Sequence, residues 1–200
     1  LILSSGIDQI DFKDKFVAIK IHFGELGNMA HLRSGYARVL VDIIKDLGGK
    51  PFLTDANTLY VGSRKNALDH IETAYRNGFS PFSTGCHVII ADGLKGNDEV
   101  EVPVEGGEYI KEAKIGRAIM DADVFVSLTH FKGHEQTGMG GTLKNTALTI
   151  VGMVFTAIAQ IIFCGIIWVV LSLVVGVVQA VLCSKVNTAY RDYRLGKLPA

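Results

Sequence analysis

The feature that most constrains this chain is a run without any charged side chain, which extends from Thr149 to Leu182. The run is longer than the roughly 20 apolar residues that cross a bilayer, and helices that are apolar all round at this length are rare in small soluble domains. It therefore predicts a membrane-spanning segment. Its length allows one long tilted helix or two short helices that turn near Cys164 and Gly165.

The apolar run divides the chain into three predicted parts. An α/β domain occupies residues 1–146, a transmembrane-like segment occupies 147–184, and a basic polar tail occupies 185–200. Basic residues near the end of a span favour the cytoplasmic side of the membrane. A hairpin of two spans would leave both flanking parts in the cytoplasm, so we expect a membrane-associated protein with a cytoplasmic α/β domain. Without insertion the chain is expected to be cytoplasmic.

The charge and cysteine content exclude two classes of function. Lys+Arg 20 balance Asp+Glu 20, and the chain has no long basic run, so nucleic acid is not expected as a partner. The three cysteines form no CxxC pair, and the chain therefore has no motif for an iron-sulfur cluster of its own.

The residues before the apolar run alternate between two hydrophobic periodicities. Strand-like patterns rich in β-branched residues occupy 15–23, 50–55, 86–92 and 123–131. Helix-like patterns occupy 34–47 and the stretch from an N-cap at Ser63 to Asn77, with a short helix around 115–120. The residues on both sides of Gly106 and Gly107 alternate, which predicts a hairpin or a strand-loop-strand excursion. Strands joined by helices predict an α/β fold with a mostly parallel sheet and helices on both faces.

Polar side chains follow each predicted strand at the point where it ends. Ligands of parallel α/β sheets bind at the carboxyl ends of the strands, so this edge is the predicted site. Its side chains are His22 and Glu25, then Asp55 and Asn57, then Asp92, and finally His130, Lys132 and His134.

His130 and His134 lie four residues apart, a spacing that a metal ion can bridge. A polar loop with two hydrogen-bonded histidines is the alternative, because Gly133 lies between them. If a divalent metal binds, its predicted ligands are His22, Asp55, Asp92, His130 and His134. The predicted catalytic or proton-transfer residues are His22, His130, Lys132 and His134.

The glycine-rich stretch "TGMGGTLKN" predicts a binding site for an anion. Glycines let backbone N–H groups converge on an anion, and a helix that begins near Thr142 would direct its positive end to the same place. The stretch lacks the GxxxxGK[ST] pattern of nucleoside triphosphate loops. A purely conformational turn is the alternative. The predicted anion ligands here are Gly138, Gly140, Gly141 and Lys144.

Four ordered blocks resemble a known family. "VAIKIHFGELGN", "GGKPFLTDANTLYVGSRKNALDH", "VIIADGLKG" and "THFKGHEQTGMGGTLKN" are similar to domain of unknown function family 362, whose members are ferredoxin-associated and described as iron-sulfur cluster-binding. The resemblance runs from Phe16 to Asn145. It implies functional roles for His22, Gly24, Glu25, Asp55, Asn57, Arg64, Asp92, Gly93, His130, Lys132, His134, Gly140, Gly141, Lys144 and Asn145.

After Asn145 the family pattern stops, so the α/β domain is expected to be truncated. The resemblance implies electron transfer with a ferredoxin or another iron-sulfur partner, which would hold the cluster that this chain lacks. We therefore expect a redox-associated protein that acts on an anionic small molecule, with Asn57, Arg64 and Asn145 among the ligand-binding residues. The alternatives are a non-catalytic module that binds phosphate or carboxylate, and a membrane-anchored remnant without activity.

Overall fold

The computed structural model describes residues 2–59, 61–106, 111–134, 138–142 and 146. These residues belong to the first of two units, 1–152 and 153–200, into which the chain divides. The predicted membrane segment, the basic tail, Lys144 and Asn145 lie outside the described residues, as do the side chain of His134 and the helix expected from Thr142. No helix in the described part is long and apolar enough to cross a bilayer. The predicted span therefore stays a prediction.

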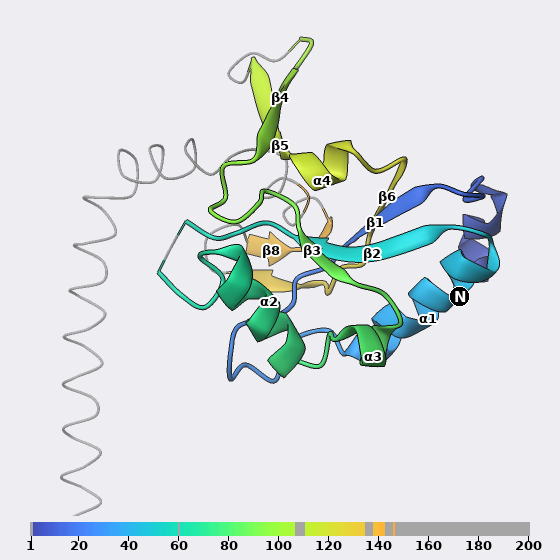
Figure 1. The fold of residues 1–200 in the computed structure, drawn as a ribbon, viewed down its shortest axis with the longest axis horizontal. Coiled ribbons are helices and arrows are strands. Elements are labelled where there is room, and N and C mark those ends of the chain that lie inside the picture. Colours follow the sequence, from blue (N-terminus) through green and yellow to red (C-terminus); the bar gives the residue numbers. More distant parts are fainter. Residues whose placement is uncertain (1, 60, 107–110, 135–137, 143–145, 147–200) are drawn as a thin grey trace, which may run out of the picture. The chain divides into compact units, whose positions relative to one another are not determined.

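A four-stranded parallel sheet forms the centre of the fold (Figure 1). Its strands are β1 (Phe16–Lys20), β2 (Lys50–Asp55), β3 (Val88–Ile90) and β6 (Val124–Ser127), in the order β3-β2-β1-β6. Every neighbouring pair is parallel. The predicted α/β class with a mostly parallel sheet is confirmed, and all four strands end at the same edge of the sheet.

The helices pack around one hydrophobic core. Helix α1 (Ser34–Asp46) buries Ala37, Leu40, Val41 and Ile44, and α2 (Ala67–Arg76) buries Ala74. Both share a core with alternate residues of β1. The opposite side of β1 is also buried, at Ala18 and Lys20.

Two helical details differ from the sequence prediction. Asn66, not Ser63, caps α2, because Asn66 has an extended backbone and its side chain accepts a hydrogen bond from the Asp69 amide at 3.0 Å. The short helix α3 (Pro81–Thr84) was not predicted. A capping box between Ser80 and Ser83, with Pro81 in the first turn, accounts for it.

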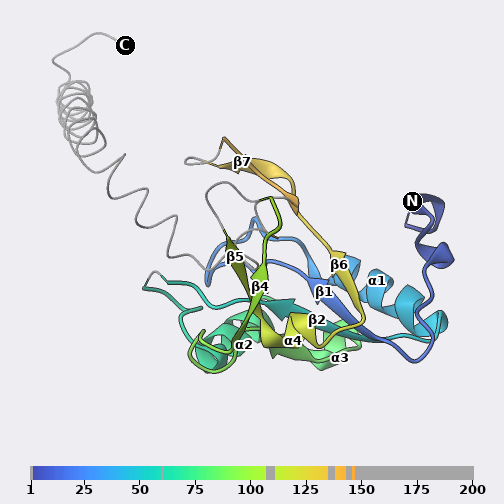
Figure 2. The same cartoon turned by 90° about the horizontal axis from the view of Figure 1, so that it is seen from above.

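Two hairpins accompany the sheet (Figure 2). The predicted one is confirmed as β4 (Glu99–Pro103) paired with β5 (Glu112–Gly116), followed by α4 (Arg117–Met120). The other corrects the loop expected after β6. There β7 (Lys132–His134) pairs with β8 (Gly138–Gly140), and Gly133 lies opposite Met139. Short 3-10 helices, η1 (Leu3–Ser5) and η2 (Ile7–Gln9), precede β1.

Candidate functional site

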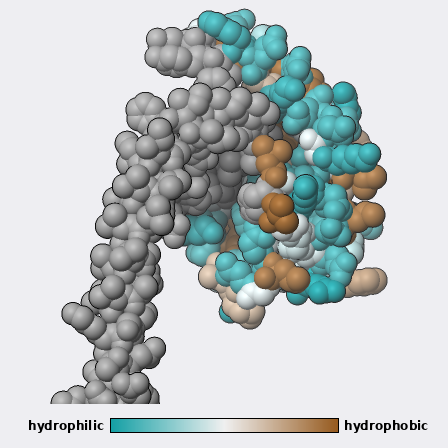
Figure 3. All heavy atoms as spheres, turned by 90° about the vertical axis from the view of Figure 1, so that its left-hand side faces the viewer, coloured by the Kyte–Doolittle hydropathy of each residue, from teal (hydrophilic) through white to brown (hydrophobic). Residues whose placement is uncertain are grey.

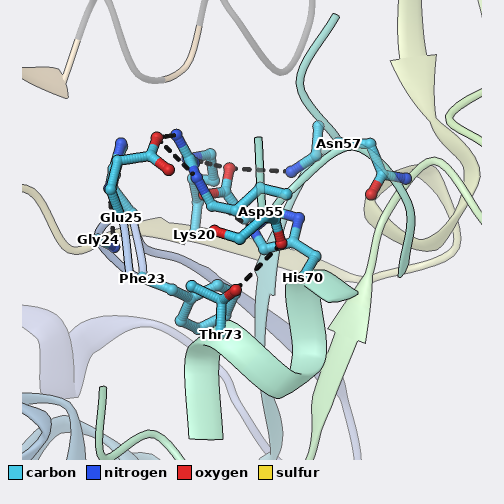
Figure 4. A network of polar contacts seen from close by, with 12 residues as sticks. Lys20, Phe23, Gly24, Glu25, Asp55, Asn57, His70 and Thr73 are labelled. Carbon is cyan, nitrogen blue, oxygen red and sulfur yellow. Dashed lines mark hydrogen bonds and ion pairs between the residues drawn. The ribbon is translucent and has the colours of Figure 1, made fainter. Parts of the chain in front are cut away.

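Asp55, the last residue of β2, is the centre of a buried charge cluster (Figure 4). Its Oδ1 lies 2.9 Å from Nζ of Lys20, the last residue of β1. Its Oδ2 lies 3.5 Å from Nη1 of Arg64 and 3.8 Å from Nε2 of His70 on α2. Parallel pairing of β1 with β2 places Lys20 beside Thr54, so the lysine has only to reach one residue further along the edge.

The charges in this cluster stabilise one another. Burial alone would raise the pKa of Asp55. The Lys20 ammonium, the His70 and His22 rings in their protonated forms, and the Arg64 guanidinium outweigh burial and hold the pKa well below its ordinary value. The Asp55 carboxylate is therefore ionised throughout the physiological range, and two cations are fixed beside it.

The loop after β1 supplies a second carboxylate to Arg64. Glu25 Oε1 accepts a hydrogen bond from Arg64 Nε at 3.0 Å and another from Arg64 Nη2. The Arg64 side chain is 4 % exposed, whereas the Glu25 side chain is 38 % exposed. Arg64 thus joins the loops after β1 and β2, with Asp55 on its inner side and Glu25 on its outer side.

His22 is held as a neutral hydrogen-bond donor. Its Nδ1 accepts a hydrogen bond from the Gly24 amide at 2.9 Å, so the single ring proton of the neutral form resides on Nε2. Burial lowers its pKa from 6.5 to about 4, against the opposing charge of Asp55 and with the help of Arg64, Lys20 and Lys132. Among the described residues Nε2 forms no hydrogen bond, and His22 is only partly buried.

Asn57 and Asp92 form a separate pair at the ends of β2 and β3. The Asp92 carboxylate accepts hydrogen bonds from the Asn57 amide at 3.0 Å and from Asn57 Nδ2 at 2.9 Å. Asn57 Nδ2 also donates to the Gly93 carbonyl at 2.8 Å. Burial raises the pKa of Asp92, and the hydrogen bonds from Asn57 oppose this only in part.

The structure therefore brings most of the predicted residues of β1, β2 and β3 to one edge, in two groups. His130 is exposed and makes no hydrogen bond or ion pair within the described part of the chain. Lys132 is also exposed, although its charge reaches His22. Gly138 and Gly140 lie in β8, and Gly141 follows it beside Phe131.

Lys20 and His70 are site residues that the sequence prediction did not include. Lys20 had a visible signal, because it is the one charged residue within β1 and lies between the apolar residues Ile19 and Ile21. His70 had a weaker one, since it lies on the same helical face as Ala67 and Ala74. It is 0 % exposed, packs edge-on against Phe23, and finds no hydrogen-bond partner for either ring nitrogen among the described residues.

The described residues do not fit the predicted metal site. They contain no group of three or more His, Cys, Asp or Glu side chains that could hold a metal ion. His22 uses its free lone pair for the Gly24 amide, Asp55 is occupied by Lys20, and Asp92 is occupied by Asn57. The part of the metal prediction that rests on the His134 side chain stays a prediction.

The face that carries the strand ends mixes hydrophilic and hydrophobic side chains (Figure 3). The loops after β1, β2 and β3 expose Leu26, Leu59, Val61 and Leu94. Charged and apolar groups therefore surround the same edge of the sheet.

Comparison with known families shows which family this chain belongs to. The family described as domain of unknown function (DUF362) matches residues 17–157. The chain belongs to the DUF362 family. The match covers all four strand ends and continues beyond Asn145, where the resemblance read from the sequence motifs ends. No curated protein and no solved structure matches this DUF362 chain significantly.

Proposed function

We propose that this DUF362 protein binds a small anionic molecule at the carboxyl edge of its parallel sheet, as a redox-associated protein that works with a ferredoxin or another iron-sulfur partner. The observation that carries the binding proposal is the state of His22. Its pKa of about 4 keeps the ring neutral at pH 7, and the Gly24 amide assigns its proton to Nε2. A neutral Nε2–H donor suits an anionic oxygen better than it suits a metal ion, which needs the lone pair instead.

The charges behind His22 support the same proposal. Lys20 and Arg64 are buried and held in place at this edge by Asp55, so neither cation has to move when an anion arrives. Lys132 adds a positive charge from β7. In this proposal Asn57, which lies just beyond the end of β2, is one of the ligand-binding residues. The glycine-rich segment supplies Gly138, Gly140, Gly141, Lys144 and Asn145.

The redox part of the proposal has a different support, namely membership of the DUF362 family and the ferredoxin association that the sequence motifs imply. With no CxxC pair in this chain, the iron-sulfur cluster would belong to the partner. Attachment to a membrane through residues 149–182, with the α/β domain in the cytoplasm, belongs to the same proposal.

The binding proposal is tested by calorimetric titration of the full chain with inorganic phosphate and with malonate. Loss of one neutral donor to an anion costs about 1.5–3 kcal/mol, or roughly a tenfold or greater loss of affinity. His22→Ala is therefore expected to weaken binding by at least about tenfold. The matched control is His87→Ala, which removes an exposed histidine just before β3 and should leave affinity unchanged. Equal affinity of wild type and His22→Ala, or no binding of either anion, would refute the proposal.

A metal-dependent mechanism is the competing version, and it rests on His130 and His134. Elemental analysis of the purified full chain for iron, zinc and nickel, before and after His130→Ala, separates the two versions. The anion proposal expects phosphate or malonate binding to survive chelator treatment. Binding that is lost with the metal would favour the metal-dependent version.

A further inference from the structure

We propose that Glu25 occupies the place of the ligand on Arg64, and that the ligand presents a carboxylate there. The inference rests on the proposed anion site and names the chemical class that it takes. In the structure Glu25 is an internal carboxylate bound to a buried guanidinium. A carboxylate from solution would replace it and complete the same interaction.

The Glu25–Arg64 contact differs from the strongest geometry of a guanidinium–carboxylate pair. Both donors, Nε and Nη2 of Arg64, point to the single oxygen Oε1 of Glu25. A guanidinium binds most strongly when two parallel N–H donors meet two carboxylate oxygens. A free carboxylate can adopt that two-oxygen arrangement, since it is not tied to the loop after β1.

The charge balance of the cluster indicates how many negative charges a replacement for Glu25 should carry. Lys20 and Arg64 carry two positive charges and Asp55 carries one negative charge, while His22 and His70, each with a pKa lowered to about 4, are neutral at pH 7. With the Glu25 carboxylate included, the charges of the cluster sum to zero. A monocarboxylate replaces that charge one for one, whereas a phosphate dianion would overcompensate it.

Burial identifies Glu25 as the replaceable partner. The Arg64 and Asp55 side chains are 4 % and 7 % exposed, whereas Glu25 is 38 % exposed. A molecule that approaches from solution therefore meets Glu25 first, and Asp55 stays in place behind Arg64.

Displacement requires rotation of one side chain and leaves the loop backbone in place. The Glu25 carbonyl accepts hydrogen bonds from the Asn28 amide at 3.1 Å and from Asn77 Nδ2 at 3.4 Å. Gly24 next to it has φ +86° and is closely packed against His31, which fixes the turn further. The backbone at residue 25 is thus anchored, so the Glu25 side chain can rotate without movement of the loop.

The test measures the dissociation constant of acetate and of inorganic phosphate for the full 200-residue chain, from the NMR shifts of the arginine Nε–H groups. If Glu25 covers Arg64 about nine-tenths of the time, apparent affinity is reduced about tenfold. Glu25→Gln should therefore lower the acetate dissociation constant by about tenfold, with a smaller effect on phosphate. Glu101→Gln is the matched control, because it removes a glutamate from an exposed ion pair with Lys114 and should change neither constant.

Two further variants keep the inference open to refutation. Arg64→Lys retains the charge but loses the planar pair of donors, so acetate binding should weaken by at least about tenfold. Glu25→Asp shortens the side chain and should act like Glu25→Gln even if the glutamine variant folds poorly. Unchanged or weaker acetate binding in both Glu25 variants, while wild type binds, would overturn the displacement. An equal gain for phosphate would overturn the carboxylate assignment. If wild type binds neither anion, the proposed function itself fails.

Discussion

Asp55 at the end of β2 and Asp92 just beyond the end of β3 lie at the same edge of the sheet, yet their surroundings differ. Asp55 is enclosed by Lys20, Arg64 and His70, and its pKa is lowered. Asp92 is enclosed by the amide groups of Asn57, and its pKa is raised. Both carboxylates are buried, with exposures of 5 % and 6 %. Cations therefore offset the cost of burying the Asp55 carboxylate, whereas neutral hydrogen-bond donors offset the cost of burying the Asp92 carboxylate.

The comparison shows what each pair contributes to the edge of the sheet. A carboxylate that balances buried cations cannot be removed without leaving those cations unpaired. A carboxylate held by neutral donors can be replaced by a neutral group of the same shape at much lower cost. Asp55 thus fixes the charges of the proposed anion site. Asp92 and Asn57 determine how the loops after β2 and β3 meet.

The largest effect is expected for Asp55→Asn, which removes the negative charge between Lys20 and Arg64. Breaking a buried ion pair from one side costs about 3–5 kcal/mol, so the free energy of unfolding of the full chain should fall by that amount at pH 7. Urea denaturation measures it. Asp42→Asn is the matched control, because the Arg38–Asp42 pair is about half exposed and should cost less than about 1 kcal/mol. Similar losses in the two variants would contradict the central role of Asp55.

Much of this arrangement could be predicted from the sequence, because it depends on local patterns. The alternation of Val17, Ile19 and Ile21 fixes the face of β1, and parallel strands bring His22 and Asp55 to one edge. The long reach of the Lys20 side chain and the orientation of His70 could not be predicted, since both depend on how neighbouring elements pack. The β7–β8 pairing was missed because its glycine-rich residues have weak strand propensity.

The second-largest effect is expected in the pH dependence of stability, to which His70 contributes. Burial lowers its pKa from 6.5 to about 4, against the attraction of Asp55. Between these values the unfolded chain binds a proton that the folded chain does not, so stability falls as the pH drops from 6.5 to 4. The fully buried His70 should contribute at most about 1.4 kcal/mol per pH unit to that slope.

Urea denaturation of the full chain at several pH values between 7 and 4 measures the slope. His70→Leu should reduce it and leave the contribution of His22, whose pKa is lowered in the same direction. Equal slopes in wild type and His70→Leu would show that His70 takes up its proton in the folded state as readily as in the unfolded state.

The smallest effect is expected for Asp92→Asn, which completes the comparison with Asp55. Asparagine keeps one oxygen for the Asn57 donors and removes a charge that burial disfavours, so the loss at pH 7 should be about 1 kcal/mol or less. Because the pKa of Asp92 is raised above 3.8, its contribution to stability declines as the pH rises through the range just above 3.8. The difference between wild type and Asp92→Asn should therefore be larger at pH 4 than at pH 7, the reverse of the order expected for Asp55→Asn. The urea midpoints of wild type and Asp92→Asn at pH 4 and pH 7 measure this difference. A loss of stability at pH 7 as large as that of Asp55→Asn would mean that Asp92 also balances a buried cation.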